Sequence, residues 1–179
     1  MASWYTSHKH LNCVLKREKM FGQLEHELEL HVPASEAWDL FGTLRIGKLV
    51  EQELPELFHK VELTQGDGGV GTVLKLSFAP GVPGPAVYKE KFTKIDNEKR
   101  IKETEVVEGG YLELGFTLFR VRFEVIEKGE ESSIIKSTIE YELKEEDASN
   151  ASLVSVQPVA TIAQLAKNYL NKAAKEPKQ

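Results

Sequence analysis

The chain has 179 residues, a formal net charge of −5 and a single cysteine, Cys13. This length fits one domain that buries roughly 70% of the surface of its unfolded chain. The negative charge argues against general binding to nucleic acid or to an anionic membrane surface, both of which favour basic proteins. One cysteine excludes an internal disulfide and a zinc cluster built on thiolates, and no segment approaches the roughly 20 apolar residues of a membrane span.

The first twenty residues predict an N-terminal appendage without ordered structure, because they are polar and basic and lack strand or helix periodicity. Their apolar patch, residues 11–15, is shorter than the run of roughly seven residues that a secretory signal needs. We therefore predict a cytoplasmic protein. Residues 21–175 are predicted to form one ligand-binding or catalytic domain, followed by a frayed tail at 176–179.

A change of pattern at Gln23 marks the first strand of this domain. Apolar residues and His26 at even positions up to Val32 alternate with glutamates and His31, which is typical of a half-buried strand. Two short helices are predicted next, one after Pro33 and one around residues 47–53.

Six strands are then predicted in quick succession. The first two are residues 58–64 and 72–78, and the next two form a hairpin that contains residues 88–92 and Lys102. The last two are long. Their apolar positions alternate with polar ones at Phe119, Val121, Phe123 and Val125, and again at Ile135, Ser137, Ile139, Tyr141 and Leu143.

After the acidic turn 144–147 the apolar period changes from two to 3.6 residues, which predicts one long amphipathic helix. We expect Pro158 to kink or reset the helix near its start. Its predicted apolar stripe is Val159, Ile162, Leu165, Ala166, Tyr169, Leu170 and Ala173. The order of elements predicts an α+β fold in which a curved, seven-stranded antiparallel sheet surrounds the C-terminal helix. The space between sheet and helix is a natural ligand cavity.

The hairpin strand at residues 88–92 carries the most informative chemistry. Side chains on a strand alternate between faces, so Tyr88, Glu90 and Phe92 share one side while Lys89 and Lys91 take the other. A phenol and a carboxylate therefore lie on one face beside an aromatic ring.

The residue that lies opposite Glu90 on the neighbouring strand is predicted from the turn of the hairpin. A three-residue turn at 95–97, with Asn97 in the left-handed conformation that asparagine tolerates, would place Glu90 directly opposite Lys102. A phenol, a carboxylate and an amine would then form an acid–base site. The alternative is a surface charge pair worth at most ~1 kcal/mol.

Two other features are tempting as ligand sites but have structural explanations. The glycine-rich run 66–71 lacks the Lys-Ser/Thr of a phosphate-binding loop, which favours a tight strand connection. His26 and His31 lie on opposite faces of their strand and cannot share a metal ion. We therefore expect no metal or nucleotide cofactor.

The order of elements and the glycine-rich loop resemble the helix-grip fold of the birch pollen allergen and the pathogenesis-related class ten proteins. The resemblance is narrower to the norcoclaurine synthase and norbelladine synthase group and covers about residues 21–172. The segments that carry it are 66–72, 80–81, 88–92, 96–98 and 108–112, with 43–45 and 134–138 shared with norbelladine synthase.

This resemblance implies that Tyr88, Glu90 and Lys102 are the catalytic residues. The aspartate that completes the set in norcoclaurine synthases falls on Val121, which can accept no proton. We expect Val121 to line the cavity and to contact a ligand. The other expected ligand contacts are Leu76, Phe78 and Phe92.

The function implied by the resemblance is condensation of an arylethylamine, dopamine or tyramine, with an aromatic aldehyde through an imine. The missing aspartate favours imine formation over Pictet–Spengler ring closure. The expected partners are therefore a small aromatic amine and aldehyde, with no nucleic acid and no membrane. Two alternatives remain: a non-catalytic carrier of small phenolic or hormone ligands, and a receptor of the abscisic acid class, whose gate and latch motifs the sequence lacks.

Overall fold

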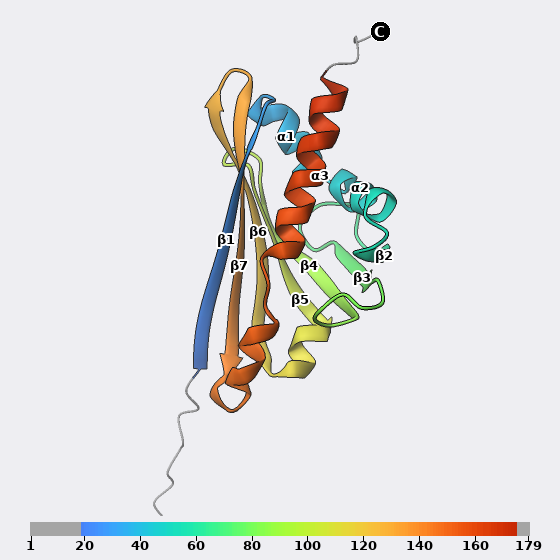
Figure 1. Ribbon diagram of the computed structural model, residues 1–179, viewed down its shortest axis with the longest axis vertical. Helices are drawn as coiled ribbons and strands as arrows, with labels where there is room; N and C mark the ends of the chain where they lie inside the picture. Colours follow the sequence, from blue (N-terminus) through green and yellow to red (C-terminus); the bar gives the residue numbers. More distant parts are fainter. Residues whose placement is uncertain (1–18, 175–179) are drawn as a thin grey trace, which may run out of the picture.

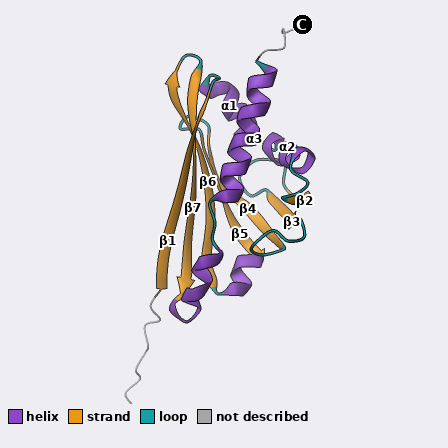
Figure 2. Cartoon of the chain, viewed as in Figure 1, coloured by secondary structure: helices purple, strands orange, loops and turns teal. Residues whose placement is uncertain are grey.

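The computed structural model describes residues 19–174 as one antiparallel sheet curved around a long helix (Figure 1 and Figure 2). The strands are β1 (Lys19–Leu30), β2 (Phe58–Gln65), β3 (Val73–Phe78), β4 (Val87–Asp96), β5 (Ile101–Gly109), β6 (Phe116–Gly129) and β7 (Ser132–Lys144). The α-helices are α1 (Ala34–Phe41), α2 (Arg45–Glu53) and α3 (Gln157–Ala173). The predicted fold class and element order are confirmed, with two unpredicted 3₁₀ helices added, η1 (Gly110–Leu114) and η2 (Glu145–Leu153).

The predicted appendage overlaps the sheet at its end, because Lys19 and Met20 belong to β1. Residues 1–18, which include Cys13, and the predicted tail 176–179 lie outside the described residues. None of the helices within 19–174 combines the length and the apolar character needed to cross a membrane.

The strand order across the sheet is β1-β7-β6-β5-β4-β3-β2. Strands β2 to β7 form a meander, and β1 pairs with β7 from Lys19 opposite Lys144 to Leu30 opposite Ser133. Helices α1 and α2 carry the chain from the edge strand β1 to the edge strand β2 (Figure 1). The inner face of the sheet is therefore enclosed by α3 and by these two short helices.

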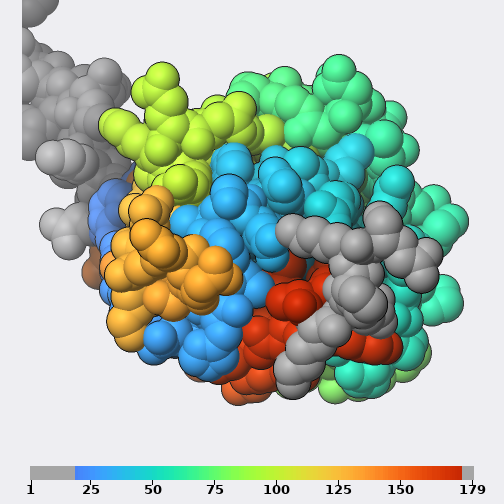
Figure 3. All heavy atoms as spheres, turned by 90° about the horizontal axis from the view of Figure 1, so that it is seen from above, coloured from blue at the N-terminus to red at the C-terminus, as the bar shows by residue number. Residues whose placement is uncertain are grey.

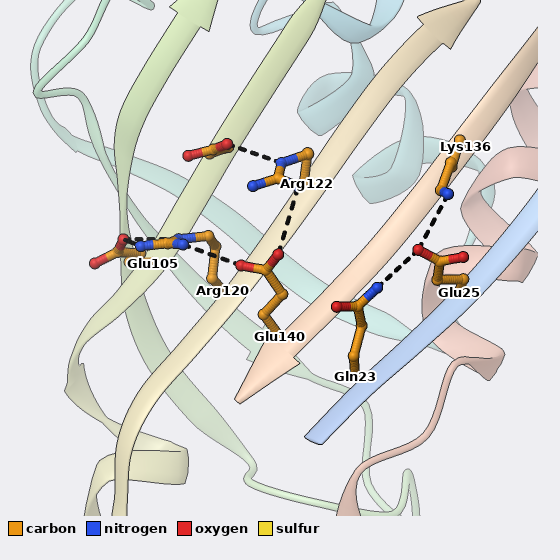
Figure 4. A network of polar contacts seen from close by, with 8 residues as sticks. Gln23, Glu25, Glu105, Arg120, Arg122, Lys136 and Glu140 are labelled. Carbon is orange, nitrogen blue, oxygen red and sulfur yellow. Dashed lines mark hydrogen bonds and ion pairs between the residues drawn. The ribbon is translucent and has the colours of Figure 1, made fainter. Parts of the chain in front are cut away.

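Charged side chains occupy the outer face of the sheet, as strand alternation requires. Figure 4 shows Arg120 between Glu105, with a contact of 2.6 Å, and Glu140, with a contact of 3.0 Å. Arg122 contacts Glu103 at 2.8 Å and Glu140 at 3.4 Å. Because β6 directs its arginines outward, the residues between them face the interior.

Helix α1 closes one end of the interior. Figure 3 views the molecule from this end and shows α1 between the β4–β5 turn and the β6–β7 turn. The indole N–H of Trp38 donates a hydrogen bond to the Asn97 side-chain oxygen at 3.0 Å, which ties α1 to the β4–β5 turn. Phe41, the last residue of α1, is fully buried and packs against Phe123 of β6 with ring centroids 5.5 Å apart.

The apolar stripe of α3 is narrower than predicted. Its buried residues are Val159, Ala163, Ala166 and Leu170. Tyr169 is 39% exposed and Ala173 is also exposed, so their assignment to the stripe was wrong. The two residues at the centre of this stripe, Ala163 and Ala166, are small. Pro158 lies in the first turn of α3, where proline needs no hydrogen-bond partner, so it starts the helix instead of kinking it.

We expect Phe41→Ala to lower the free energy of unfolding by about 3–5 kcal/mol, because it opens a cavity in a fully buried contact. Urea unfolding followed by circular dichroism measures this change. Phe21→Ala is the matched control: its side chain is 70% exposed, and the change should stay within about 0.5 kcal/mol. An equal effect of both substitutions would contradict the packing described.

Candidate active site

A cavity lies between the inner face of the sheet, α2 and the start of α3, and most of its lining is apolar. Strands β3 to β7 line one side, while Val50 of α2 and Val159 of α3 lie on the other. All of the residues predicted from the sequence as catalytic or ligand-binding lie around this one cavity. They are Leu76, Phe78, Tyr88, Glu90, Phe92, Lys102 and Val121.

Lys102 is the buried cation of the cavity, with 3% of its surface exposed. Its Nζ donates a hydrogen bond to the main-chain carbonyl of Thr43 at 3.0 Å and lies 4.0 Å from the centroid of the Phe92 ring. Burial lowers the pKa of Lys102 to about 8, against the opposing effect of the Glu90 charge. Both the charged and the uncharged amine are therefore accessible near neutral pH.

Glu90 is the carboxylate of the same cavity and lies on the face of β4 that also carries Tyr88 and Phe92. Its Oε2 accepts a hydrogen bond from the Thr104 hydroxyl at 3.2 Å. Burial raises the pKa of Glu90 to about 6, and the charge of Lys102 and the hydrogen bond from Thr104 limit the rise. A carboxylate in this range can both accept and return a proton near neutral pH.

The predicted pairing of Glu90 with Lys102 was wrong. Glu90 lies opposite Val106, and Lys102 lies opposite Ile95. The register shifts twice along this pair of strands, between Lys89 and Glu90 and between Phe92 and Lys94, and a bulge of this kind adds one residue to one strand. Both side chains still line the cavity, and the charge of each acts on the pKa of the other.

The turn also differs from the prediction, because it spans four residues, 97–100, between the paired residues Asp96 and Ile101. Arg100, with φ of 52°, takes the left-handed conformation predicted for Asn97. Asn97 instead accepts the hydrogen bond from Trp38. A tertiary contact, which local turn preferences do not include, thus gives Asn97 its role.

Glu90 and Lys102 do not neutralise each other by direct contact. Among the described residues, the hydrogen-bond partner of the Lys102 amine is the Thr43 carbonyl, that of the Glu90 carboxylate is the Thr104 hydroxyl, and no ion pair within 4.0 Å joins the two. Each group is held by its own anchor, which leaves the acid and the base available to a molecule in the cavity.

Thr43 and Thr104 were not identified from the sequence. Thr104 could have been found, since it lies two residues after Lys102 and so faces the same side of β5. Thr43 contributes a main-chain carbonyl from the junction of α1 and α2, and no side-chain pattern reveals that contact.

Two tyrosines line the cavity next to the acid–base pair. Burial raises the pKa of Tyr88 well above its ordinary value, and the charge of Glu90 adds to the effect. Tyr111 stacks on Phe119 with ring centroids 3.7 Å apart, and burial raises its pKa to about 12. Both phenols are therefore neutral near pH 7 and can donate hydrogen bonds.

Val121 occupies the position next to Thr104. It pairs with Thr104 on β5 and with Ile139 on β7, and opposed residues share a face, so all three point into the cavity. Val121 and Ile139 therefore make the wall next to the Thr104 hydroxyl apolar.

The glycine-rich run 66–71 forms a tight connection between β2 and β3, as predicted. Gly66 has φ of 88°, and a Cβ there would lie 2.6 Å from the Thr72 hydroxyl. That hydroxyl accepts a hydrogen bond from the Gly68 amide at 2.9 Å. Elsewhere in residues 19–174, no three or more His, Cys, Asp or Glu side chains gather in a way that could hold a metal ion.

We expect Thr104→Val to raise the pKa of Glu90 further above 6, by roughly one unit, because the carboxylate loses its hydrogen bond while remaining buried. Carbon NMR of the labelled carboxyl group measures this pKa directly. Thr104→Ser keeps the hydroxyl and should restore the original value. An unchanged pKa in the valine variant would show that the hydrogen bond does not stabilise the ionised form.

A curved sheet gripping a helix, with a buried carboxylate and amine in an apolar cavity, defines a small-molecule-binding protein equipped for acid–base chemistry. The model of the Pathogenesis-related protein Bet v 1 family matches residues 19–173, and the chain belongs to this family.

The chain is also similar to individual proteins of known activity. The chain is 48% identical to norbelladine synthase from Narcissus pseudonarcissus over 151 residues, which cover 84% of this chain and 93% of that protein. It is 37% identical to S-norcoclaurine synthase 2 from Papaver somniferum over 163 residues, 90% of this chain and 70% of that protein. Among solved structures, norcoclaurine synthase from Thalictrum flavum in complex with dopamine and hydroxybenzaldehyde matches with a TM-score of 0.80 and 34% identity, covering 99% of both chains.

Proposed function

We propose that this protein is an enzyme that condenses an arylethylamine, dopamine or tyramine, with an aromatic aldehyde to form an imine. The observation that carries the proposal is the pair of Glu90 and Lys102, with pKa values shifted toward neutrality in one apolar cavity. The 48% identity to norbelladine synthase supports this reaction class. The similarity to a norcoclaurine synthase solved with dopamine and hydroxybenzaldehyde supports the same class of substrates.

The cavity residues match the needs of imine formation. The amine must be uncharged to attack the carbonyl carbon, the carbinolamine oxygen must be protonated to leave as water, and a dry site must limit the reverse reaction. Lys102 lies where it can bind the carbonyl oxygen or carry a proton, and Glu90 can accept a proton from the attacking amine. The tyrosine hydroxyls of Tyr88 and Tyr111 are available to orient a phenol or catechol.

The test is turnover with tyramine and 3,4-dihydroxybenzaldehyde, with the imine reduced chemically and the secondary amine quantified by chromatography and mass. We expect turnover well above the buffer rate in the wild type. Dopamine and 4-hydroxyphenylacetaldehyde, run in parallel, report ring closure through the chirality of the product. If no pairing exceeds the buffer rate, the proposal is wrong.

A second candidate is a non-catalytic carrier of small phenolic ligands, which the largely apolar cavity favours. In that protein Glu90 and Lys102 would fix the polar end of a ligand without moving protons. Tight ligand binding combined with no turnover would identify the carrier.

We expect Val121→Asp to raise the fraction of ring-closed product formed from dopamine and 4-hydroxyphenylacetaldehyde. The new carboxylate would lie on the cavity face opposite Thr104, where it can accept the ring proton that cyclisation releases. Val121→Asn has nearly the same shape without the charge and is the matched control. An equal product ratio in wild type, Val121→Asp and Val121→Asn would show that this position does not govern ring closure.

A further inference from the structure

The amine of Lys102 has an unusual set of contacts for a lysine. It is 3% exposed, and the hydrogen bond it makes runs to the carbonyl of Thr43, a neutral acceptor. Other lysines of the sheet, such as Lys89 with Glu108 and Lys136 with Glu25, have carboxylate partners that favour the charged form. An uncharged Lys102 amine can keep its hydrogen bond to Thr43 and still offer its lone pair to the cavity.

The uncharged form is also populated. With a pKa near 8, about one tenth of the Lys102 amines are uncharged at pH 7, compared with fewer than about one in a thousand at an ordinary pKa of 10.5. A desolvated lysine in an apolar pocket is the usual arrangement for a nucleophilic amine that attacks carbonyl groups. The cavity that Lys102 lines is the one proposed to hold the aldehyde.

We propose that Lys102 takes up the aldehyde covalently as a Schiff base and then transfers it to the amine substrate. This inference rests on the condensation proposed above and adds an enzyme-bound intermediate to it. The anchoring of Nζ by Thr43, its position over Phe92 and the nearby carboxylate of Glu90 carry the inference.

The steps balance without any further reactant. The Lys102 nitrogen attacks the carbonyl carbon, and a proton moves from that nitrogen to the oxygen through Glu90, giving a carbinolamine. Protonated Glu90 then donates a proton to the hydroxyl group, the nitrogen lone pair forms the C=N bond as the C–O bond breaks, and water leaves the protonated Schiff base beside an ionised Glu90. The substrate amine adds to this carbon and passes one proton to the Lys102 nitrogen and one to Glu90. The bond to Lys102 breaks, and the lysine departs as a free amine, leaving the product imine.

The side chains around Lys102 would stabilise a Schiff base at this position. A protonated Schiff base carries its positive charge where the Lys102 ammonium lies, 4.0 Å from the centroid of the Phe92 ring, and an aromatic face attracts a cation. The apolar lining limits hydrolysis of the C=N bond.

Reductive trapping tests the proposal. The full-length protein is incubated with 3,4-dihydroxybenzaldehyde alone in the presence of sodium cyanoborohydride, which converts a Schiff base into a stable secondary amine. Peptide mass spectrometry should locate one adduct at Lys102, heavier by the mass of the aldehyde less one oxygen atom. We expect labelling at Lys102 to exceed that at any exposed lysine by at least tenfold, and added tyramine to suppress it.

Two variants serve as controls. Lys102→Met should lose the adduct, whereas Lys91→Met, which removes an exposed lysine from the opposite face of β4, should keep it. Because the attachment site is read from wild-type peptides, the result does not depend on the folding of either variant.

The outcomes separate this inference from the proposed function. Turnover without an adduct at Lys102 overturns the Schiff base and leaves the condensation intact. An adduct that tyramine neither displaces nor converts into product overturns the transfer step, and the proposed function falls with it only if turnover also stays at the buffer rate. An adduct that tyramine removes while product appears supports both.

Discussion

Replacing Lys102 with methionine is expected to lower kcat/KM for the condensation of tyramine with 3,4-dihydroxybenzaldehyde by roughly 10²–10⁴-fold. The variant loses the group that can bind the carbonyl oxygen, carry a proton or form the Schiff base. Methionine retains an unbranched side chain that can pack against Phe92, so the cavity wall should stay in place. Steady-state kinetics with the reduced product quantified by chromatography measures the loss.

The matched control is Lys91→Met, on the face of β4 that points away from the cavity. It should change kcat/KM by less than about threefold, because Lys91 is exposed and does not line the site. Retention of full activity in Lys102→Met would show that the amine takes no part in the reaction.

Replacing Glu90 with glutamine is expected to reduce kcat by a similar roughly 10²–10⁴-fold, because the amide keeps the shape but cannot accept a proton. In the wild type, activity should rise with pH through about 6 as Glu90 ionises, and this limb should be missing from the residual activity of the variant. Thr104→Val should move the same limb of an otherwise active enzyme to higher pH. A Glu90→Gln variant with the wild-type rate and pH profile would assign the base to another group.

Glu90→Gln should also stabilise the folded protein at neutral pH. The pKa of Glu90 is raised from 4.5 in the unfolded chain to about 6 in the folded protein, so the folded state binds the proton more tightly. The wild type therefore loses stability as pH rises from 4.5 through 6, by about 2 kcal/mol at most, and Glu90→Gln avoids that loss. Urea unfolding should show a gain at pH 7 that disappears near pH 4. Lower activity with higher stability would mark Glu90 as a functional residue held at a cost to folding.

Much of the site could be predicted from strand alternation. The period of two placed Tyr88, Glu90 and Phe92 on one face, and that face lines the cavity in the structure. The opposing position of Lys102 could not be derived, because the two β-bulges and the four-residue turn depend on tertiary contacts such as that of Trp38 with Asn97. Alternation is a local property of the backbone, whereas register is a property of the folded sheet.

The prediction of helix α3 from apolar periodicity was also incomplete. The 3.6-residue period located α3, but it assigned Tyr169 to the buried stripe although this residue is 39% exposed. Ala163 was left out of the predicted stripe although it is fully buried, because alanine carries little hydrophobicity and so weighs little in a periodicity argument. The anchor of Lys102 on the Thr43 carbonyl lies beyond any pattern, because every residue has such a carbonyl and only the fold selects one.

The central claim, that Glu90 and Lys102 perform chemistry on a bound substrate, is tested most directly by measuring turnover and ligand affinity in the same preparations. Calorimetry with the reduced secondary amine of tyramine and 3,4-dihydroxybenzaldehyde gives Kd for the wild type, Glu90→Gln and Lys102→Met, and the condensation assay gives kcat. We predict that kcat falls at least a hundredfold in both variants while Kd changes by less than about tenfold. Wild-type binding without turnover above the buffer rate, or a loss of affinity that matches the loss of rate, would contradict the account.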